Sequence, residues 1–452
     1  MIKVKLLTHT NISPADLASH AALICYQAEA PEIGKQIDIE NRLFNVGHHT
    51  TLQHFFFTFT IENIAVSDIT LGLHLTHPFY NSDQRSGRYS ARMFDNPDFE
   101  LIENYIKNLW PEVSNENLDK TIDFIKTGLE LYQINRDDAI EAATNFIKNE
   151  RPFASAKSIE LNAPKIAQEQ MRVFVSTIFP TALDFTVNLS TLAAIYRSAW
   201  TPALKRVSTE MVKQVLEKFP ELDYMFKPDS HSEDSWSPSI ISTEAGIKQK
   251  PVAKLLSQLG EFLEMPNKKI MHPVDLLHFT PEQMDNSFRC IETEIETSLA
   301  TMGQDQRHRT IRRSQPIFTG NFYMPPITVD LGLNHDSLSL MTDWLNLREL
   351  LPATLHAAIA PYGAMVAYRK SGSINAIAHE QAKRLCWCAQ EEIYHLSLDL
   401  RTEIAKQSPD SELLNLLQPP CFIDGVCGEG ARYCGRDLTK RGEPDFNKTR
   451  RI

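Results

Sequence analysis

The sequence predicts an α+β protein made of two related halves. Strand-like runs rich in β-branched and aromatic residues are followed by longer amphipathic stretches, and this order of segments occurs twice. A polar stretch rich in serine and proline, from Glu221 to about Lys250, separates the two occurrences. Because 452 residues exceed what one ordinary core holds, we predict a domain at 1–220, a linker at 221–250 and a second domain at 251–452.

The first half is predicted to begin with strands and to continue with helices. Lys3–Thr8 is the expected opening strand, and the aromatic run within Leu52–Ile64 predicts a buried one. Ser13 before Pro14 is a typical helix start. Helical periodicity then predicts helices over Ala15–Tyr26, twice within Asn115–Glu150, and over Ala163–Phe179 and Ser190–Phe219.

The second half repeats this mixture. Helices are predicted over Met284–Met302, Leu338–Ile359 and Ser373–Lys406, with an extended segment over Pro325–Leu331. The stretch 419–436 contains several glycines and three cysteines, so we expect a loop-like, cysteine-rich tail.

Composition limits the classes of function. The net charge of -11 argues against non-specific binding to nucleic acid, which needs a broad basic surface. No apolar run is long enough to cross a bilayer, and the N-terminal residues lack a signal-peptide pattern. An odd number of cysteines, seven, suits a reducing compartment better than a disulfide framework. We therefore predict a cytoplasmic protein that binds neither nucleic acid nor membranes.

A cationic cluster in the second half stands out against this acidic background. Arg307, His308, Arg309, Arg312 and Arg313 repel one another unless an anion neutralises them, and guanidinium groups suit phosphate and carboxylate. In the first half, Ser86-Gly87-Arg88-Tyr89 offers a hydroxyl, an approachable backbone and another guanidinium. The two runs are interpreted as complementary parts of one nucleotide site.

These runs resemble the signature of the flavin-dependent thymidylate synthases, divided between the halves. The second half has the family's Arg-His-Arg as Arg307–Arg309, with Gln304 before it, but Ile317 and Thr319 stand where serine and arginine are expected. The first half keeps Ser86–Tyr89 but has Thr76-His77-Pro78 in place of Arg-His-Arg.

Two later elements of the family pattern are divided in the same way. The first half keeps Arg172 and Asn188. The second half has Ala357 and Ser373 at the corresponding positions. The second half keeps the run Arg384-Leu-Cys-Trp-Cys-Ala-Gln-Glu-Glu-Ile. In the first half, Ala199 stands at the position of its arginine. Each half has lost what the other retains, as expected for a duplicated and fused gene whose halves specialised.

The resemblance implies a fold and an activity. Each half is expected to be an antiparallel sheet with a long-helix bundle, and the chain to form a homodimer that mimics the family's homotetramer. The implied enzyme is a methyltransferase that reductively methylates dUMP to dTMP, with FAD as cofactor and NADPH and methylenetetrahydrofolate as co-substrates. Its sites would be composite, either within one chain or across the dimer.

The resemblance also implies roles for individual residues. The nucleotide phosphate would be held by Ser86, Gly87, Arg88 and Arg172, and the base by Gln304 and Arg384. Arg307 would lie near base and flavin, so Arg307 and Arg384 are the predicted catalytic residues. FAD would contact His54, Asn188, Arg307, His308 and Arg309.

Other interpretations stay open at this point. Taken singly, the Arg307–Arg313 cluster suits a solvated face, the Ser86–Tyr89 run a turn and Arg172 a snorkelling side chain. Asn188 suits a helix cap and His54 a core histidine. A diverged flavin enzyme acting on another pyrimidine nucleotide, or a non-catalytic nucleotide- or metal-binding protein, would also fit. Cys421, Cys427 and Cys434 could bind a metal with a fourth ligand from Cys386, Cys388 or His395; free thiols are the simpler interpretation, and we predict no metal.

Overall fold

The structure is a computed structural model that describes residues 1–76, 79–88, 92–227, 236–258, 290–409, 413–430, 433–443 and 450–452. His77, Pro78 and Tyr89, the linker residues 228–235 and the first residues of the helix expected from Met284 lie outside these ranges. In the described part of the chain, no helix is both long and apolar enough to cross a bilayer.

Four antiparallel strands form the sheet of the first half. They are β1 (Lys3–His9), β2 (Phe56–Ala65), β4 (Pro180–Asn188) and β3 (Tyr80–Gln84), in the spatial order β1-β2-β4-β3. Along β2 the buried Phe57, Phe59 and Ile61 alternate with more exposed neighbours, as expected for a sheet with one covered face. The strand begins later than predicted because His49–His54 form a 3₁₀ turn.

The second sheet has the same order of strands. It consists of β6 (Val252–Leu255), β7 (Ile291–Ser298), β10 (Ala364–Gly372) and β9 (Ile317–Tyr323), in the order β6-β7-β10-β9 and all antiparallel. Short strands β5 (Gly246–Lys248) and β8 (Arg312–Arg313) pair with β9 and β10. The sequence and structure thus agree on two similarly built halves and on the α+β class.

The helix predicted over Met284–Met302 is wrong for its described part. Ile291, Thr293 and Ile295 are buried and alternate with glutamates, so the period is two and the segment forms β7. Only Leu299–Asp305 is helical, as α11. The extended segment expected over Pro325–Leu331 is also wrong, since Pro326 starts helix α12 (Pro326–Asp330).

The other predicted helices are present with shifted ends and with breaks that matter for the site, and the helix at Phe99–Leu109 was not predicted. In the first half they include α1 (Pro14–Leu23), α5 (Phe99–Leu109), α6 (Asn115–Ile134), α7 (Arg136–Glu150), α8 (Ala156–Met171), α9 (Leu189–Ser198) and α10 (Pro202–Lys218). In the second half they include α13 (Asn334–Asn346), α14 (Ala353–Ala358), α15 (Ile374–Arg384) and α16 (Glu391–Gln407). The helix expected over Ser373–Lys406 is interrupted by a loop at 385–390, and α18 (Pro420–Asp424) lies in the expected loop-like tail.

The halves meet through an exchange of backbone hydrogen bonds. Thr177 N–H donates to the Ala360 carbonyl at 2.8 Å, and Tyr362 N–H donates to the Val175 carbonyl at 2.9 Å. Thr177 and Tyr362 are 185 positions apart, as are Val175 and Ala360. The two donors are therefore equivalent positions and so are the two acceptors, which is the pattern that a two-fold relation between the halves produces.

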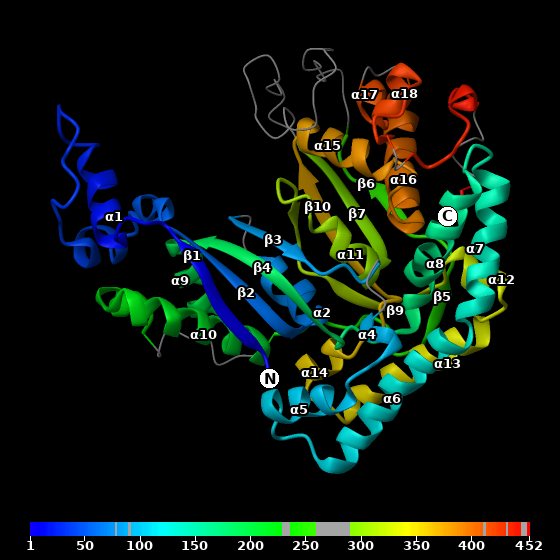
Figure 1. The fold of residues 1–452 in the computed structure, drawn as a ribbon, viewed down its shortest axis with the longest axis horizontal. Helices are drawn as coiled ribbons and strands as arrows, with labels where there is room; N and C mark the ends of the chain where they lie inside the picture. Colours follow the sequence, from blue (N-terminus) through cyan, green and yellow to red (C-terminus); the bar gives the residue numbers. More distant parts are fainter. Residues whose placement is uncertain are drawn as a thin grey trace.

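The same offset recurs at the ends of the central strands. Asn188 ends β4 and caps α9, and Ser373, also 185 positions later, follows β10 and caps α15. Helices α10 and α16 then pack on the corresponding strands β1 and β6. A single buried apolar core runs through both halves, so the two sheets and their helices are parts of one body (Figure 1).

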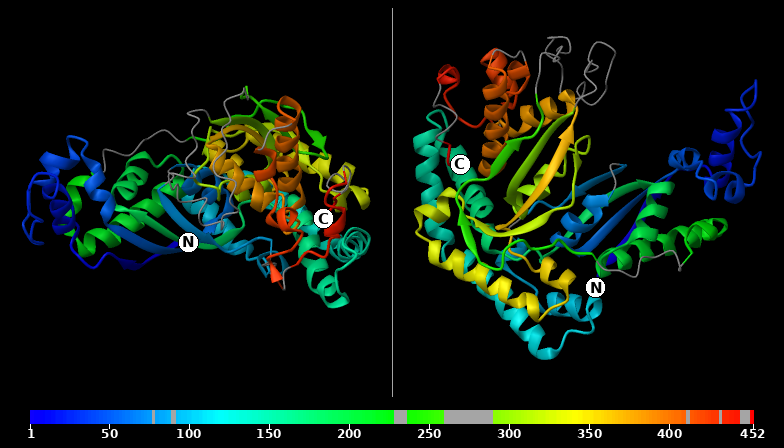
Figure 2. Two further views of the ribbon diagram at one scale, coloured as in Figure 1. Left: turned by 90° about the horizontal axis from the view of Figure 1, so that it is seen from above. Right: turned by 180° about the vertical axis from the view of Figure 1, so that it is seen from behind.

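The long helices of the first half cross over to the second. Helices α6 and α13 lie side by side, and α7 and α8 pack against α12 (Figures 1 and 2). Gly128 of α6 allows a close approach, because a Cβ built on it would stand 2.3 Å from the Phe174 carbonyl oxygen. Helix α6 thereby supports the short segment Arg172–Phe174 that follows α8.

Gly128→Ala is therefore expected to destabilise the fold by about 1–3 kcal/mol, because the new methyl group must displace the 172–174 backbone. Urea unfolding followed by circular dichroism measures this. Gly72→Ala is the matched control, since nothing lies within 4 Å of its Cβ position and its φ is not positive. Equal stability of both variants would contradict the close approach of α6 to this segment.

Candidate nucleotide site

Arg172 from the first half lies buried among groups of the second half. Its Nη2 donates to Gln390 Oε1 at 3.1 Å and lies 3.5 Å from the Ala300 carbonyl oxygen, and its guanidinium stands 5.0 Å from the centre of the Tyr362 ring. Burial lowers the pKa of Arg172. A buried guanidinium whose hydrogen-bond partners are all neutral is costly unless an anion joins it. This site thus favours an anionic ligand.

The predicted Ser86-Gly87-Arg88 run lies against the same point. A Cβ on Gly87 would be 3.2 Å from Arg172 Nη1 and 3.5 Å from the Tyr362 hydroxyl. Arg88 forms an ion pair with Glu169 and also donates from Nη2 to the Cys388 carbonyl at 3.3 Å. Both arginines of the first half therefore reach the 385–390 loop of the second.

The second half contributes Gln304 and Arg384. Gln304 Nε2 donates to Gln390 Oε1, the same oxygen that Arg172 contacts. Arg384 Nη2 donates to the Gln304 carbonyl at 2.7 Å, and its Nε donates to His308 Nε2 at 2.9 Å. Partial burial lowers the pKa of Arg384 to about 10, so it is still a cation at neutral pH. One network thus joins predicted site residues of both halves.

Several buried polar atoms in this network have no hydrogen-bond partner among the described residues. They are Arg172 Nε, Gln304 Oε1, Gln390 Nε2 and His308 Nδ1. His308 is neutral, since burial and Arg384 hold its pKa well below the usual value, and its Nε2 accepts from Arg384. Its proton therefore resides on Nδ1. Unsatisfied buried donors and an acceptor in one place are typical of a ligand site.

The cationic cluster is resolved into distinct parts by the structure. Asp305 is buried and accepts from Arg313 Nε at 2.5 Å and Lys370 Nζ at 3.1 Å, while Glu380 accepts from Lys370 at 2.8 Å. Burial raises the pKa of Asp305, but these cations outweigh it and hold the pKa well below its usual value. Arg313 is thereby neutralised and structural.

Arg309 lies at the boundary with the first half. It donates to Asn81 Oδ1 at 3.2 Å and to the Ser82 carbonyl at 3.2 Å, and its guanidinium is 4.9 Å from the centre of the Tyr80 ring. Arg307 is exposed beside it, close enough to lower, together with Arg309, the pKa of the buried His74, which burial chiefly depresses to about 3. These two arginines keep the positive charge that the sequence predicted.

Glu391 and Glu392 follow Gln390 at the start of α16, and both are fully buried. Glu392 accepts from the Ser298 backbone at 2.7 Å, and from Thr297 and Thr301 hydroxyls at 2.8 and 2.6 Å. It therefore fastens the start of α11, the helix that carries Gln304. Glu391 accepts from the Tyr323 hydroxyl at 3.0 Å, and burial raises its pKa to about 8.

The two-fold relation between the halves gives the Arg172 network an equivalent position around Ala357, and side chains pack that position closely. Ala357 takes the place of Arg172, and the void beside it, lined also by Asp68, Thr201 and Trp236, measures only about 10 Å³. Nearby, Asp68 accepts from the Tyr105 hydroxyl at 2.6 Å. The two-fold relation thus yields one ligand-type site and one packed one.

The remaining predicted cofactor residues lie elsewhere. Asn188 ends β4 and its side chain caps α9, accepting from Thr191 N–H at 2.8 Å. His54 is exposed just before β2, at the same end of the sheet as Asn188, whose partner in the strand pairing is Phe56. Arg172 precedes the opposite end of β4, so one chain does not bring His54 and Asn188 to the network.

The cysteines lie mainly near the 385–390 loop. A hydrogen bond from Cys388 lowers the pKa of Cys386, and Arg436 Nη2 donates to Cys421 Sγ at 3.2 Å. His395 Nε2 is engaged with the Arg450 carbonyl at 2.8 Å. Among the described residues, no three His, Cys, Asp or Glu side chains are arranged to hold a metal ion.

Sequence reasoning did not assign Gln390, Glu169 or Tyr362 to the site. Gln390 lies within the retained Arg384-to-Ile393 run, so the family pattern could have indicated it as a site residue. Glu169 precedes Arg172 by three residues and so lies one helical turn away. Tyr362 had no sequence signal, because only the pairing of the halves brings it to Arg172.

The fold and this network define an α+β protein with a site for an anionic ligand between two similar halves. Residues 5–221 match the family described as thymidylate synthase complementing protein. The flavin-dependent thymidylate synthase of Clostridium tetani (strain Massachusetts / E88) is 26% identical over 234 residues, covering 49% of this chain and 85% of that protein. The likeness to this family therefore lies in residues 5–221, just under half of the chain.

Solved structures of similar proteins match about half of the chain. Thymidylate synthase X from Helicobacter pylori with FAD and dUMP is 19% identical, covers 51% of this chain and 99% of its own, and has a TM-score of 0.32. The UMP/dUMP methylase PolB from Streptomyces cacaoi with 5-Br UMP is 13% identical, with coverages of 51% and 96% and a TM-score of 0.31.

The buried Glu391 predicts a pH dependence of stability. Burial raises its pKa in the folded chain to about 8, above the ordinary value of a glutamate, so the folded state keeps a proton that the unfolded chain loses. Stability therefore falls as pH rises through this window, by up to about 1.4 kcal/mol per pH unit. Glu391→Gln, which does not titrate, should lose less stability, as measured by urea unfolding between about pH 5 and 8.

Glu217→Gln, at an exposed position on α10, is the control and should follow the unmodified chain. If Glu391→Gln has the same pH profile as the unmodified chain, Glu391 is already ionised in the folded state.

Proposed function

We propose that the chain is an FAD-dependent thymidylate synthase that reductively methylates dUMP to dTMP, with methylenetetrahydrofolate and NADPH as co-substrates. The observation that carries this proposal is the Arg172–Gln390–Gln304 network, in which residues retained by opposite halves share one oxygen. The family match over residues 5–221 and the flavin-dependent relative support the reaction class.

The nucleotide phosphate is assigned to the first half. Arg88 and Arg172 offer guanidinium donors, Ser86 a hydroxyl, and Gly87 a backbone that approaches Arg172 without a side chain between them. A phosphate dianion forms charge-assisted hydrogen bonds with such donors. It would also compete with Glu169 for Arg88, so we propose that the ion pair with Glu169 holds Arg88 in place before the nucleotide binds.

The base is assigned to the second half. Uracil presents two carbonyl acceptors and one ring N–H, and the second half offers an unsatisfied donor at Gln390 Nε2 and an unsatisfied acceptor at Gln304 Oε1. Arg384 stays cationic and is placed by Gln304 and His308. A cation beside the pyrimidine stabilises negative charge on the ring and so activates its C5 carbon.

FAD is assigned to His308 and Arg309, with Arg307 between flavin and base. The unsatisfied His308 Nδ1–H and Arg309 Nε–H can donate to phosphate or flavin oxygens. When bound, the flavin supplies the hydride, with NADPH as its reductant, and the chain supplies orientation and charge. His54 and Asn188 stay candidates for a flavin bound across two copies of the chain, since their end of the sheet faces away from this network.

We propose that each chain assembles one composite site by itself, so that a homodimer has two sites where a homotetramer of single-domain chains has four. Three contacts within one chain support this: Arg88 with Cys388, Arg172 with Gln390, and Arg309 with Asn81. The packed void at Ala357 supports one site rather than two per chain.

Arg172→Ala is expected to weaken dUMP binding by about 10- to 100-fold, because a charged hydrogen-bond donor to the phosphate is lost. Tritium release from 5-tritiated dUMP, with NADPH and methylenetetrahydrofolate, measures KM and kcat. Arg369→Ala, at an exposed pair with Glu294, is the control. Colourless protein that takes up no FAD would overturn the proposed function.

Assembly within one chain predicts no rescue between two inactive variants. Arg88→Ala and Arg307→Ala chains, co-expressed with different affinity tags and purified through both, should release no tritium. A doubly tagged pair of unmodified and Arg307→Ala chains should keep about half of the full activity, as one of two sites stays whole. Activity in the first pair would place the composite sites across two chains instead.

A further inference from the structure

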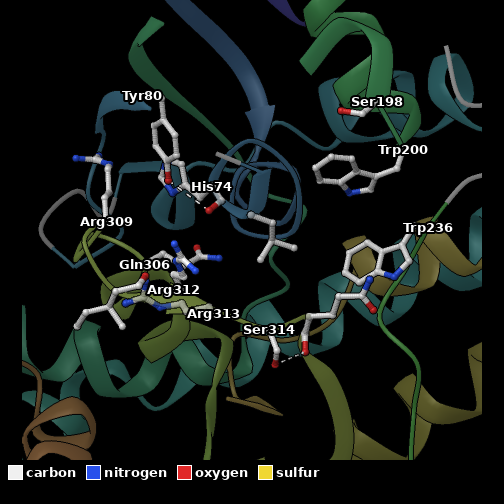
Figure 3. A pocket seen from close by; sticks show the side chains of 13 residues that line it. His74, Tyr80, Ser198, Trp200, Trp236, Gln306, Arg309, Arg312, Arg313 and Ser314 are labelled. Carbon is white, nitrogen blue, oxygen red and sulfur yellow. Dashed lines mark hydrogen bonds between the residues drawn. The ribbon is translucent and has the colours of Figure 1, made fainter. Parts of the chain in front are cut away.

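A cavity of about 780 Å³ opens between the halves beside Arg309 (Figure 3). Its lining includes Tyr80 and Trp200 of the first half, Trp236 of the linker, and Arg309, Arg312 and Ser314 of the second half. Its volume lies within the range of small-molecule and cofactor pockets. The nucleotide network of Arg172, Gln304 and Arg384 does not line it, so this cavity offers space for a second ligand next to the first.

One wall of the cavity is aromatic. The Trp200 and Trp236 rings lie edge to face with centroids 6.5 Å apart, and both point toward the cavity in Figure 3. Trp200 Nε1 donates to the Leu71 carbonyl at 3.2 Å, and Trp236 N–H donates to the Trp200 carbonyl at 3.0 Å. The linker is thereby fastened to the first half, and two indole faces are held in place before any ligand binds.

The opposite wall is basic. Arg309 has a buried Nε without a partner among the described residues, and Arg312 is exposed, with no carboxylate partner in the part of the chain that the structure describes. None of the described residues that line the cavity is acidic. His74 is kept neutral by its burial. An indole wall facing guanidinium groups suits a planar heteroaromatic ligand that carries phosphates.

We propose that the linker is part of the cofactor site: a planar ring of a dinucleotide, FAD under the proposed function, packs against Trp236 and Trp200, and its phosphates meet Arg309 and Arg312. This inference rests on the proposed function for the identity of the ligand. Trp236 lies outside residues 5–221, the part that matches the family. The linker therefore does more than join the halves, since it closes the cofactor cavity.

Titration of the full-length chain with FAD, followed by tryptophan fluorescence, tests this inference. Trp236→Ala is expected to weaken FAD binding about tenfold, the effect of losing one stacked ring, and to remove part of the quenching. Arg312→Ala, at an exposed position where the fold is not at risk, should weaken binding about three- to tenfold and reduce its salt dependence. Ile241→Ala, an exposed linker position 68% accessible, is the control and should bind FAD normally.

Binding of FAD to Trp236→Ala with unchanged affinity and quenching would overturn the inference and leave the proposed function standing. If the unmodified chain takes up no FAD, the proposed function fails, and ADP then serves as the probe of the cavity. If the unmodified chain binds ADP and both Trp236→Ala and Arg312→Ala weaken this binding, the result would support a dinucleotide-type site without flavin. Absence of binding by both FAD and ADP would overturn the inference as well.

Discussion

The backbone exchange between 175–177 and 360–362 is the constraint on which the rest of the structure depends. Because Thr177 and Tyr362, which are equivalent positions, each donate to a carbonyl of the other half there, the segments that lead into β4 and β10 lie side by side. Arg172 stands just before this junction and Tyr362 within it, so the pairing itself brings a first-half guanidinium to second-half groups. The position of the site is thus a consequence of how two sheets are joined.

Burial of Arg172 among neutral partners gives this junction its chemistry. A guanidinium in such surroundings is stabilised by an added anion, whereas Arg313 is already balanced by Asp305 and Lys370 by Glu380. The arginines of the chain therefore separate into those that hold the fold and those that await a ligand. Both kinds lie within a few residues of each other along the second half, and their surroundings alone distinguish them.

The two halves differ in ways that fit a division of labour. Under the proposed function, the first half supplies donors for the phosphate, and the second supplies groups for the base. At the equivalent position Ala357 lies beside a void of about 10 Å³, with Trp236 in its lining. The same residue also lines the large cavity, so the segment between the halves borders both spaces.

The sequence by itself indicated the α+β class, two similarly built halves and part of the network, namely Arg172, Gln304 and Arg384, because strand composition, helix starts and charged motifs are local signals. It failed at β7, where a helix was predicted for a segment whose burial alternates with a period of two, and at α12, where proline begins a turn of helix. Only the tertiary structure decided that the halves meet within one chain and that Gln390 joins Arg172 to Gln304. The two contacts of Gln390 join residues 86 and 218 positions apart, and no local pattern specifies which distant groups will share a hydrogen bond.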